Sequence, residues 1–167
     1  MARTTTIPQR PILAVDIDGV ICPYGWDESL PSPPGRVIVV DGLPHCLSHA
    51  AGLTLRSLVP FFELIWASGW EDRANRHLPP LLEMPPFPYL SFAGTARFGT
   101  ADWKLPVLEA FGSGRPLAWI DDSLDHKCYA WAEHRPEPTL LVQPISGIGI
   151  TVEHRDELIH WALDHRT

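Results

Sequence analysis

Short apolar runs alternate with segments of helical periodicity along this chain, and the alternation limits the folds that the sequence can adopt. The apolar runs that suit strands lie at 12–17, 61–67, 89–92, 117–120 and 139–142. The helical patterns lie at 43–58, 71–82, 103–111, 125–134 and 152–165. Strands that alternate with helices predict βαβ units. We therefore expect an α/β domain with a parallel sheet of about five strands and helices on both faces.

The interval 19–41 interrupts this alternation. It is rich in Pro and Gly and contains one β-branched run, 37–40, which predicts a loop or a hairpin flap. The chain has 167 residues, 45% of them apolar, and shows no repeat or domain linker. This size suits one domain over residues 1–167 with a core of its own.

The charged residues are scattered, and their balance is acidic, with a net charge of −7. Lys and Arg form no run, so the sequence shows no basic groove for nucleic acid. Residues 1–11 lack the apolar stretch of a signal peptide, and no apolar run is long enough to span a membrane. We expect a cytoplasmic protein. The three cysteines match neither a disulfide framework nor a zinc motif.

Two acidic residues, Asp16 and Asp18, lie at the end of the first apolar run. They are two positions apart, so in an extended strand their side chains share a face. Their carboxylates would repel each other by about 4 kcal/mol at about 4 Å and an effective dielectric constant of about 20. A Mg²⁺ ion, which prefers oxygen ligands, would relieve that repulsion. A solvated strand end with two surface acids is the alternative.

Residues that could bind an anion lie at two places, after the second apolar run and at the start of the helix predicted over 103–111. Ser68 and Gly69 come directly after 61–67. A hydroxyl and free backbone N–H groups at a helix start can bind an anion, although an ordinary turn is the alternative. Lys104 lies at the start of a predicted helix, where a cation is unfavourable unless it faces an anion. A surface lysine is the alternative there.

A second acidic pair, Asp121 and Asp122, follows the run 117–120. The pair can supply a further metal ligand, or it can help to cap the next helix together with Ser123 or Asp125. In parallel sheets the ligand crevice lies at the carboxyl ends of the strands. An acid pair, a hydroxyl, a lysine and a second acid pair would meet there, and this conjunction favours a functional site over four unrelated turns.

Four segments resemble the motifs of the haloacid dehalogenase (HAD) superfamily. VDIDGV at 15–20 resembles the first motif, Ser68 the second, Lys104 the third and WIDDS at 119–123 the fourth. WASGWEDRAN at 66–75 is similar to a stretch of the HAD domain associated with Swiss Army Knife RNA repair proteins. The later TADWK, PLAWIDD and GIT…LIHWA segments resemble theirs too, so the resemblance runs from about residue 11 to about residue 162.

The resemblance implies a phosphatase that works through an aspartyl-phosphate intermediate. Asp16 would be the nucleophile, and Asp18 would be the general acid and then the general base. Ser68, with Gly69, would bind a phosphate oxygen, and Lys104 would neutralise the charge on phosphate and aspartate. The dehalogenases of the superfamily lack the second acid of the first motif, so the presence of Asp18 favours phosphoryl transfer.

The resemblance also implies a Mg²⁺ ion held by Asp16, the backbone carbonyl of Asp18 and an acid from the second pair. Asp122 takes the place of the Asp in the family's Gly-Asp form and is the favoured ligand. Asp121 stays open as the alternative, because Asp121 and Asp125 also match an acid pair four residues apart.

Neither interval between the motifs holds a full α/β cap, so the resemblance implies a capless enzyme with an open site. Such a site suits the terminal phosphate of a nucleic-acid end, as in RNA repair, or of a nucleotide. Tyr24 and Trp26 in the flap could stack on a base, although packing within the flap is the favoured alternative for both. A phosphatase of sugar or other small phosphate esters and a non-catalytic phosphate-binding module are the alternatives. The sequence carries no clear signal for an oligomeric state.

Overall fold

The structure is a computed structural model that describes residues 9–25, 29 and 32–166. A parallel sheet with the strand order β4-β1-β5-β6 forms its centre. The strands of this sheet are β1 (Ile12–Val15), β4 (Glu63–Trp66), β5 (Leu117–Ile120) and β6 (Thr139–Val142). The helices that flank it are α1 (His49–Leu58), α2 (Asp72–Leu82), α3 (Leu105–Gly112), α4 (His126–His134) and α5 (Val152–Asp164). The predicted α/β class, with a parallel sheet between helices, is confirmed.

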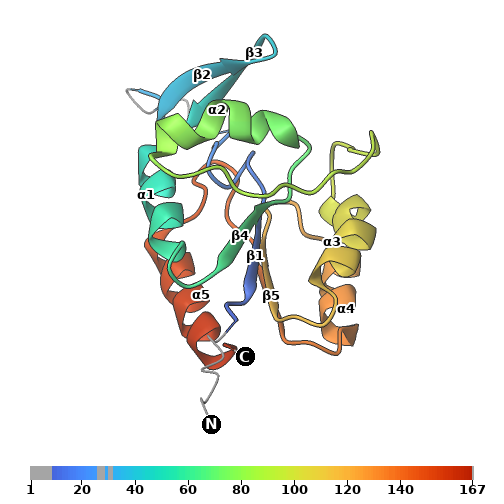
Figure 1. The fold of residues 1–167 in the computed structure, drawn as a ribbon. Coiled ribbons are helices and arrows are strands. Elements are labelled where there is room, and N and C mark those ends of the chain that lie inside the picture. Colours follow the sequence, from blue (N-terminus) through green and yellow to red (C-terminus); the bar gives the residue numbers. More distant parts are fainter. Residues whose placement is uncertain (1–8, 26–28, 30–31, 167) are drawn as a thin grey trace.

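The two central strands, β1 and β5, are apolar and buried at every position because helices cover both faces of the sheet. Figure 1 shows α1 and α5 on one side and α3 and α4 on the other. Leu13 and Val15 of β1 pack into the first layer, and Ile12 and Ala14 pack into the second. Successive side chains of a strand alternate between its two faces. A strand between two helical layers therefore needs an apolar residue at each position.

The register of the sheet brings the strand ends level with one another. Val15 of β1 pairs with Trp66 of β4 and with Ile120 of β5, and Ile120 pairs with Val142 of β6. The chain passes from β1 to β4 on one side and later enters β5 on the other, so the topological switch point lies between β1 and β5. The residues that follow Val15 and Ile120 therefore meet at one edge of the sheet.

An antiparallel hairpin of β2 (Arg36–Val40) and β3 (Leu43–Leu47) confirms the predicted flap but corrects the helix predicted over 43–58. Asp41 and Gly42 both have positive φ, at 50° and 82°, which suits a tight hairpin turn. This turn pairs residues 43–47 with β2. The helix α1 begins only after Ser48, whose Oγ accepts a hydrogen bond from the backbone N–H of Ala51 at 3.2 Å.

The strand predicted at 89–92 is reduced to one isolated bridge between Tyr89 and Trp66. The preceding residues Pro85, Pro86 and Pro88 have no N–H group, so the ladder cannot extend toward the start of β4. On the other side of the bridge, the N–H of Phe92 donates to Oε1 of Glu71 at 2.9 Å instead of to a strand. The parallel sheet therefore has four strands in the described part of the chain, against about five expected.

The remaining elements agree with the predicted ranges to within two residues, except at Lys104. The first two residues of the helix predicted over 103–111 belong instead to a 3₁₀ turn, η1 (Ala101–Lys104), and α3 begins after it. Asp125 caps α4 by accepting from the backbone N–H of Lys127 and Cys128, which settles the choice between Ser123 and Asp125. None of the helices in the described ranges is long and apolar enough to cross a membrane.

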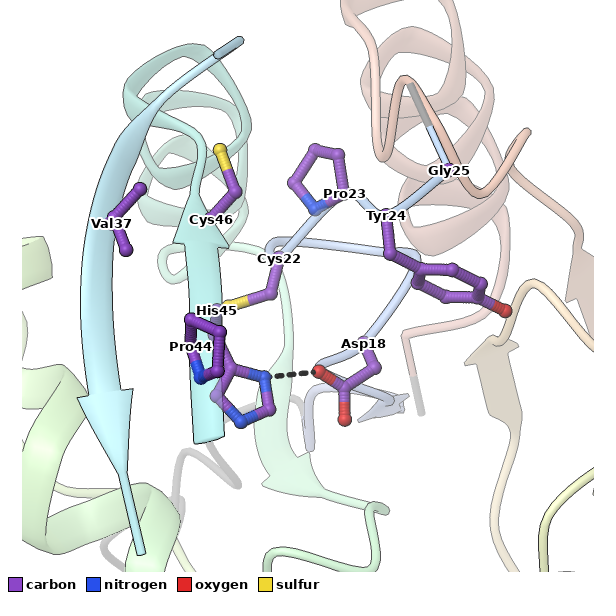
Figure 2. A pocket seen from close by; sticks show the side chains of 9 residues that line it. All are labelled: Asp18, Cys22, Pro23, Tyr24, Gly25, Val37, Pro44, His45 and Cys46. Atoms are coloured by element: carbon purple, nitrogen blue, oxygen red, sulfur yellow. Dashed lines mark hydrogen bonds and ion pairs between the residues drawn. The ribbon is translucent and has the colours of Figure 1, made fainter. Parts of the chain in front are cut away.

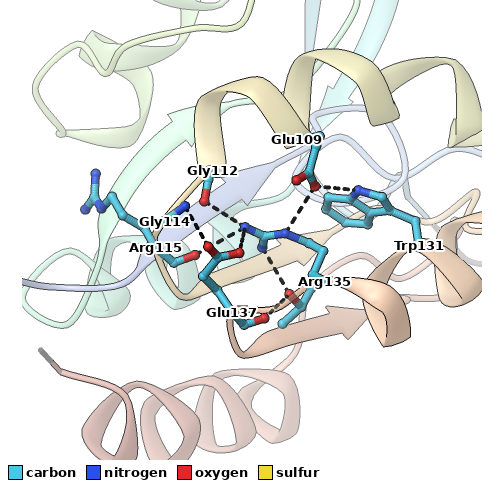
Figure 3. A network of polar contacts seen from close by, with 8 residues as sticks. Glu109, Gly112, Gly114, Arg115, Trp131, Arg135 and Glu137 are labelled. Carbon is cyan, nitrogen blue, oxygen red and sulfur yellow. Dashed lines mark hydrogen bonds and ion pairs between the residues drawn. The ribbon is translucent and has the colours of Figure 1, made fainter.

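A buried arginine joins the loops at the opposite edge of the sheet (Figure 3). Arg135 directly follows α4, and its side chain is only 1% exposed. The guanidinium donates to the carbonyl of Gly112 at 2.7 Å and to that of Arg115 at 3.3 Å. It also donates to Oγ1 of Thr139 at 3.0 Å, and its guanidinium lies 5.3 Å from the centre of the Trp131 ring. These contacts tie the segments that lead into β5 and β6.

We predict that Arg135→Ala lowers the free energy of unfolding by about 3 kcal/mol, because it removes a buried cation that bonds the carbonyls of Gly112 and Arg115 and pairs with Glu109 and Glu137. The matched control is Arg155→Ala on α5, whose ion pair with Asp156 is exposed to solvent and contributes less than about 1 kcal/mol. Urea denaturation followed by circular dichroism measures both. Equal effects of the two substitutions would contradict the structural role of Arg135.

Candidate metal centre

Three aspartates meet at the switch point of the sheet. Asp16 directly follows β1, and Asp121 and Asp122 directly follow β5. The backbone continues the ladder beyond the strands, because Asp16 N–H donates to the carbonyl of Ile120 at 3.0 Å and Asp121 N–H to that of Val142 at 3.1 Å. One carboxylate oxygen of each aspartate lies within 4.8 Å of those of the other two. The predicted convergence of these acids at the strand ends is present in the structure.

Lys104 is the buried cation of this cluster. Its Nζ lies 2.6 Å from Oδ2 of Asp121 and 3.1 Å from Oδ1 of Asp16, and its side chain is 4% exposed. The turn η1 fixes its place, since Ala101 N–H donates to the carbonyl of Ser123 at 2.9 Å beside the second acid pair. Lys104 is therefore not a surface lysine. It is paired with two carboxylates that lie at the ends of β1 and β5.

Burial and ion pairing shift the pKa values of this cluster in opposite directions. Burial would lower the pKa of Lys104, but the neighbouring charges of Asp16 and Asp121 outweigh it and raise that pKa. Burial raises the pKa of Asp16 to about 7, although Lys104 works in the opposite direction. Burial also raises the pKa of Asp121, again against the effect of Lys104. One ammonium group is not enough to neutralise the acids around it.

Asp122 is held by neutral hydroxyl groups rather than by a cation. Tyr24 Oη and Ser146 Oγ each donate to its Oδ2 at 2.7 Å, and Ser123 Oγ donates to its Oδ1 at 3.1 Å. Gly19 allows this position, because its φ is +74° and a Cβ atom there would overlap the Asp122 carboxylate. The Asp122 carboxylate is thus oriented without being neutralised.

The donor set fits a divalent cation. Three carboxylates surround one ammonium group, which leaves an excess of two negative charges when all are ionised. Hard cations such as Mg²⁺ and Ca²⁺ take oxygen ligands of this kind. Asp16, Asp121 and Asp122 could therefore hold a metal ion, as the sequence predicts.

The carboxylate of Asp18 lies outside this cluster and has partners of its own. Its Oδ2 accepts from the indole N–H of Trp70 at 2.8 Å, and its Oδ1 lies 3.0 Å from Nδ1 of His45. The rings of His45 and Trp70 meet edge to face, with centroids 4.6 Å apart. Both oxygens of Asp18 are thus oriented, while 44% of the side chain stays exposed. The predicted role of its backbone carbonyl as a metal ligand stays a prediction.

Ser68 and Gly69 lie at the end of β4, beside the end of β1. The backbone N–H of Ala67 donates to the carbonyl of Val15 at 2.8 Å, which holds the two strand ends together. Ser68 is 2% exposed, and its Oγ lies 3.4 Å from the backbone nitrogen of Trp70. The structure thus places both residues at the same edge of the sheet as the cluster, and their phosphate-binding role stays a prediction.

Sequence reasoning missed the partners that orient Asp18 and Asp122. His45 and Ser146 carry no local signal, because each reaches the site from a segment distant in sequence. The contact of the Tyr24 hydroxyl with Asp122 was not predicted either, and base stacking by the Tyr24 ring stays untested. Trp26 lies outside the described residues.

No protein-family model matches the chain, and no curated protein matches it.

We predict that Mg²⁺ stabilises the protein and that Gly19→Ala removes this stabilisation. At about 100 times its dissociation constant, a bound ion adds about 2.7 kcal/mol to the free energy of unfolding. Gly114→Ala is the matched control, because its φ of +76° gives a similar strain of about 1–2 kcal/mol with no atom near the added Cβ. Thermal unfolding with and without Mg²⁺ measures the effect. An unchanged Mg²⁺ response in Gly19→Ala would contradict this position for the ion.

Proposed function

We propose that this chain is a Mg²⁺-dependent phosphomonoester hydrolase of the HAD type, acting through an aspartyl-phosphate. The observation that carries the proposal is the position of Asp16. Its carboxylate stands at the switch point of the sheet, inside the three-aspartate cluster and 3.1 Å from the Lys104 ammonium group. Its side chain is 13% exposed, which leaves it open to a substrate. The motif resemblance supports the same assignment.

In the first step, a carboxylate oxygen of Asp16 attacks phosphorus and the bond from phosphorus to the ester oxygen breaks. Asp18 gives its proton to the leaving oxygen, which departs as an alcohol. The exposed carboxyl group of Asp18, oriented by His45 and Trp70, suits this task. Lys104 keeps the attacking group and the incoming phosphate from repelling each other.

In the second step, water attacks phosphorus of the aspartyl-phosphate. Asp18, now a carboxylate, takes a proton from that water, and the bond between phosphorus and the Asp16 oxygen breaks. Inorganic phosphate leaves, and Asp16 and Asp18 return to their starting states. Ser68 and the backbone N–H of Gly69 are proposed to bind the phosphate oxygens that do not react.

We propose that Mg²⁺ is held by Asp16, Asp122 and the backbone carbonyl of Asp18. When bound, the ion would supply positive charge to the phosphate oxygens. Asp121 is less suited as a direct ligand, because its carboxylate is fully buried and already pairs with Lys104 at 2.6 Å. In this arrangement Asp121 would hold the lysine, and Asp122, oriented by three hydroxyl groups, would supply a ligand oxygen.

The arrangement of Asp18 favours an enzyme over a non-catalytic phosphate-binding module. A module that only binds phosphate gains nothing from an acid with two orienting partners beside the anion site. The proposed substrate is a phosphorylated molecule with an accessible terminal phosphate. Nucleic-acid ends, nucleotides and small phosphate esters all meet that description.

We predict that Asp16→Asn lowers the hydrolysis of acetyl phosphate by at least about three orders of magnitude, because the amide cannot attack phosphorus. Asp156→Asn, on the exposed face of α5, is the control and keeps wild-type activity. Phosphate release in the presence of Mg²⁺ measures both. Wild-type turnover by Asp16→Asn would refute the nucleophile.

We also predict that Trp70→Phe lowers kcat about tenfold for benzyl phosphate and less for 4-nitrophenyl phosphate. The substitution keeps the ring but removes the donor that orients Asp18, and proton donation matters most for a poor leaving group. Trp131→Phe is the matched control, since it removes an indole donor to Glu109 at the same 2.8 Å, far from Asp18 in the fold. Equal losses on both substrates would argue that Trp70 acts only through stability.

A further inference from the structure

A cavity of about 260 Å³ opens beside Asp18, between the β2–β3 hairpin and the segment 22–25 (Figure 2). Asp18 and His45 line it together, and Figure 2 shows the contact between them at its edge. In the proposed mechanism Asp18 protonates the leaving oxygen. The group attached to that oxygen must therefore lie next to Asp18, which is where the cavity is.

The remaining lining of the cavity is apolar or weakly polar. Pro23, Val37 and Pro44 contribute carbon surface, and Cys22 and Cys46 contribute the only thiols. Burial raises the pKa of both thiols, so they are neutral and offer little to a charged ligand. Among the described residues that line the cavity, none is Lys or Arg. A second phosphate group would find no cation there.

Two polar groups of the lining are already engaged. The Tyr24 hydroxyl donates to Asp122, and the His45 Nδ1 faces Asp18. A sugar in this cavity would leave several hydroxyl groups without hydrogen bonds, which is costly in an apolar site. An aromatic ring needs no such partners and gains from contact with the prolines and Val37.

We propose that this cavity binds the organic part of the phosphate ester and selects an uncharged aromatic ring over a sugar or a second phosphate. The inference rests on the proposed function and adds the substrate class to it. A cavity of 150 Å³ holds benzene, so 260 Å³ admits a ring system of about ten non-hydrogen atoms. Such a ring can belong to a small aryl ester or to a phosphotyrosine side chain.

The test compares esters whose leaving groups have similar reactivity. Benzyl phosphate and ribose 5-phosphate are both esters of primary alcohols, so a difference in kcat/KM reports the cavity. We expect kcat/KM to be at least about tenfold higher for benzyl phosphate, the discrimination of which apolar pockets are capable. Naphthyl phosphate and a phosphotyrosine peptide then distinguish a small ester from a protein-borne one. Preference for ribose 5-phosphate or for a 5′-phosphorylated oligonucleotide overturns the proposal.

A pair of hairpin variants tests the place of binding. Val37 lines the cavity and Val39 does not, although both are exposed, at 52% and 63%. We expect Val37→Phe to fill the cavity and lower kcat/KM for benzyl phosphate about tenfold, with acetyl phosphate unaffected. Val39→Phe is expected to change neither. Equal effects of both variants, or none, overturn the proposal.

Binding of 2-naphthol, followed by NMR, separates this proposal from the proposed function because it needs no turnover. Naphthol that shifts the resonances of the cavity residues in the wild type and in Val39→Phe, but not in Val37→Phe, supports the cavity even if acetyl phosphate is not hydrolysed. Hydrolysis of acetyl phosphate without naphthol binding supports the proposed function and refutes the aromatic-ring site.

Discussion

The ion pairs of Lys104 with Asp16 and Asp121 are the interaction on which the rest of the site depends. A buried carboxylate without a partner costs several kcal/mol and tends to take up a proton. The ammonium group, 2.6 Å from Asp121 and 3.1 Å from Asp16, offsets much of that cost. The pKa of Asp16 is nevertheless raised to about 7, so the compensation is incomplete. An acid left in this state has a strong affinity for further positive charge, which is the physical basis for expecting a cation beside it.

The sequence was sufficient to predict where these charges meet, because parallel strands buried on both faces have an unmistakable pattern. ILAV and LAWI are apolar at each position, and the acids begin at the next residue. Once both runs are strands of one parallel sheet, Asp16 and Asp121 must emerge at the same edge. The sequence alone did not show that Lys104 is buried, because its burial depends on how η1 packs against the loop after β5.

The second strand of the hairpin and the partners of Asp18 and Asp122 could not be predicted, because they depend on contacts between segments distant in sequence. Residues 43–58 carry helical spacing, and only the Asp41–Gly42 turn indicates that the first five belong to a strand. His45 contacts Asp18 across 27 positions of the chain, and Trp70 does so across 52. Contacts of this kind follow from tertiary packing, and no local pattern encodes them.

The β2–β3 hairpin therefore contributes both to the orientation of Asp18 and to the shape of the cavity beside it. It carries His45, which contacts the proposed acid, and Val37, which forms a wall of the cavity beside that acid. A shift of the hairpin would change the volume available to the leaving group and the orientation of Asp18 together. In the proposed mechanism, a leaving group that fits the cavity would hold the hairpin in the position that keeps His45 on Asp18. A group too large for the cavity would displace both, so substrate choice and proton transfer would be set by the same element.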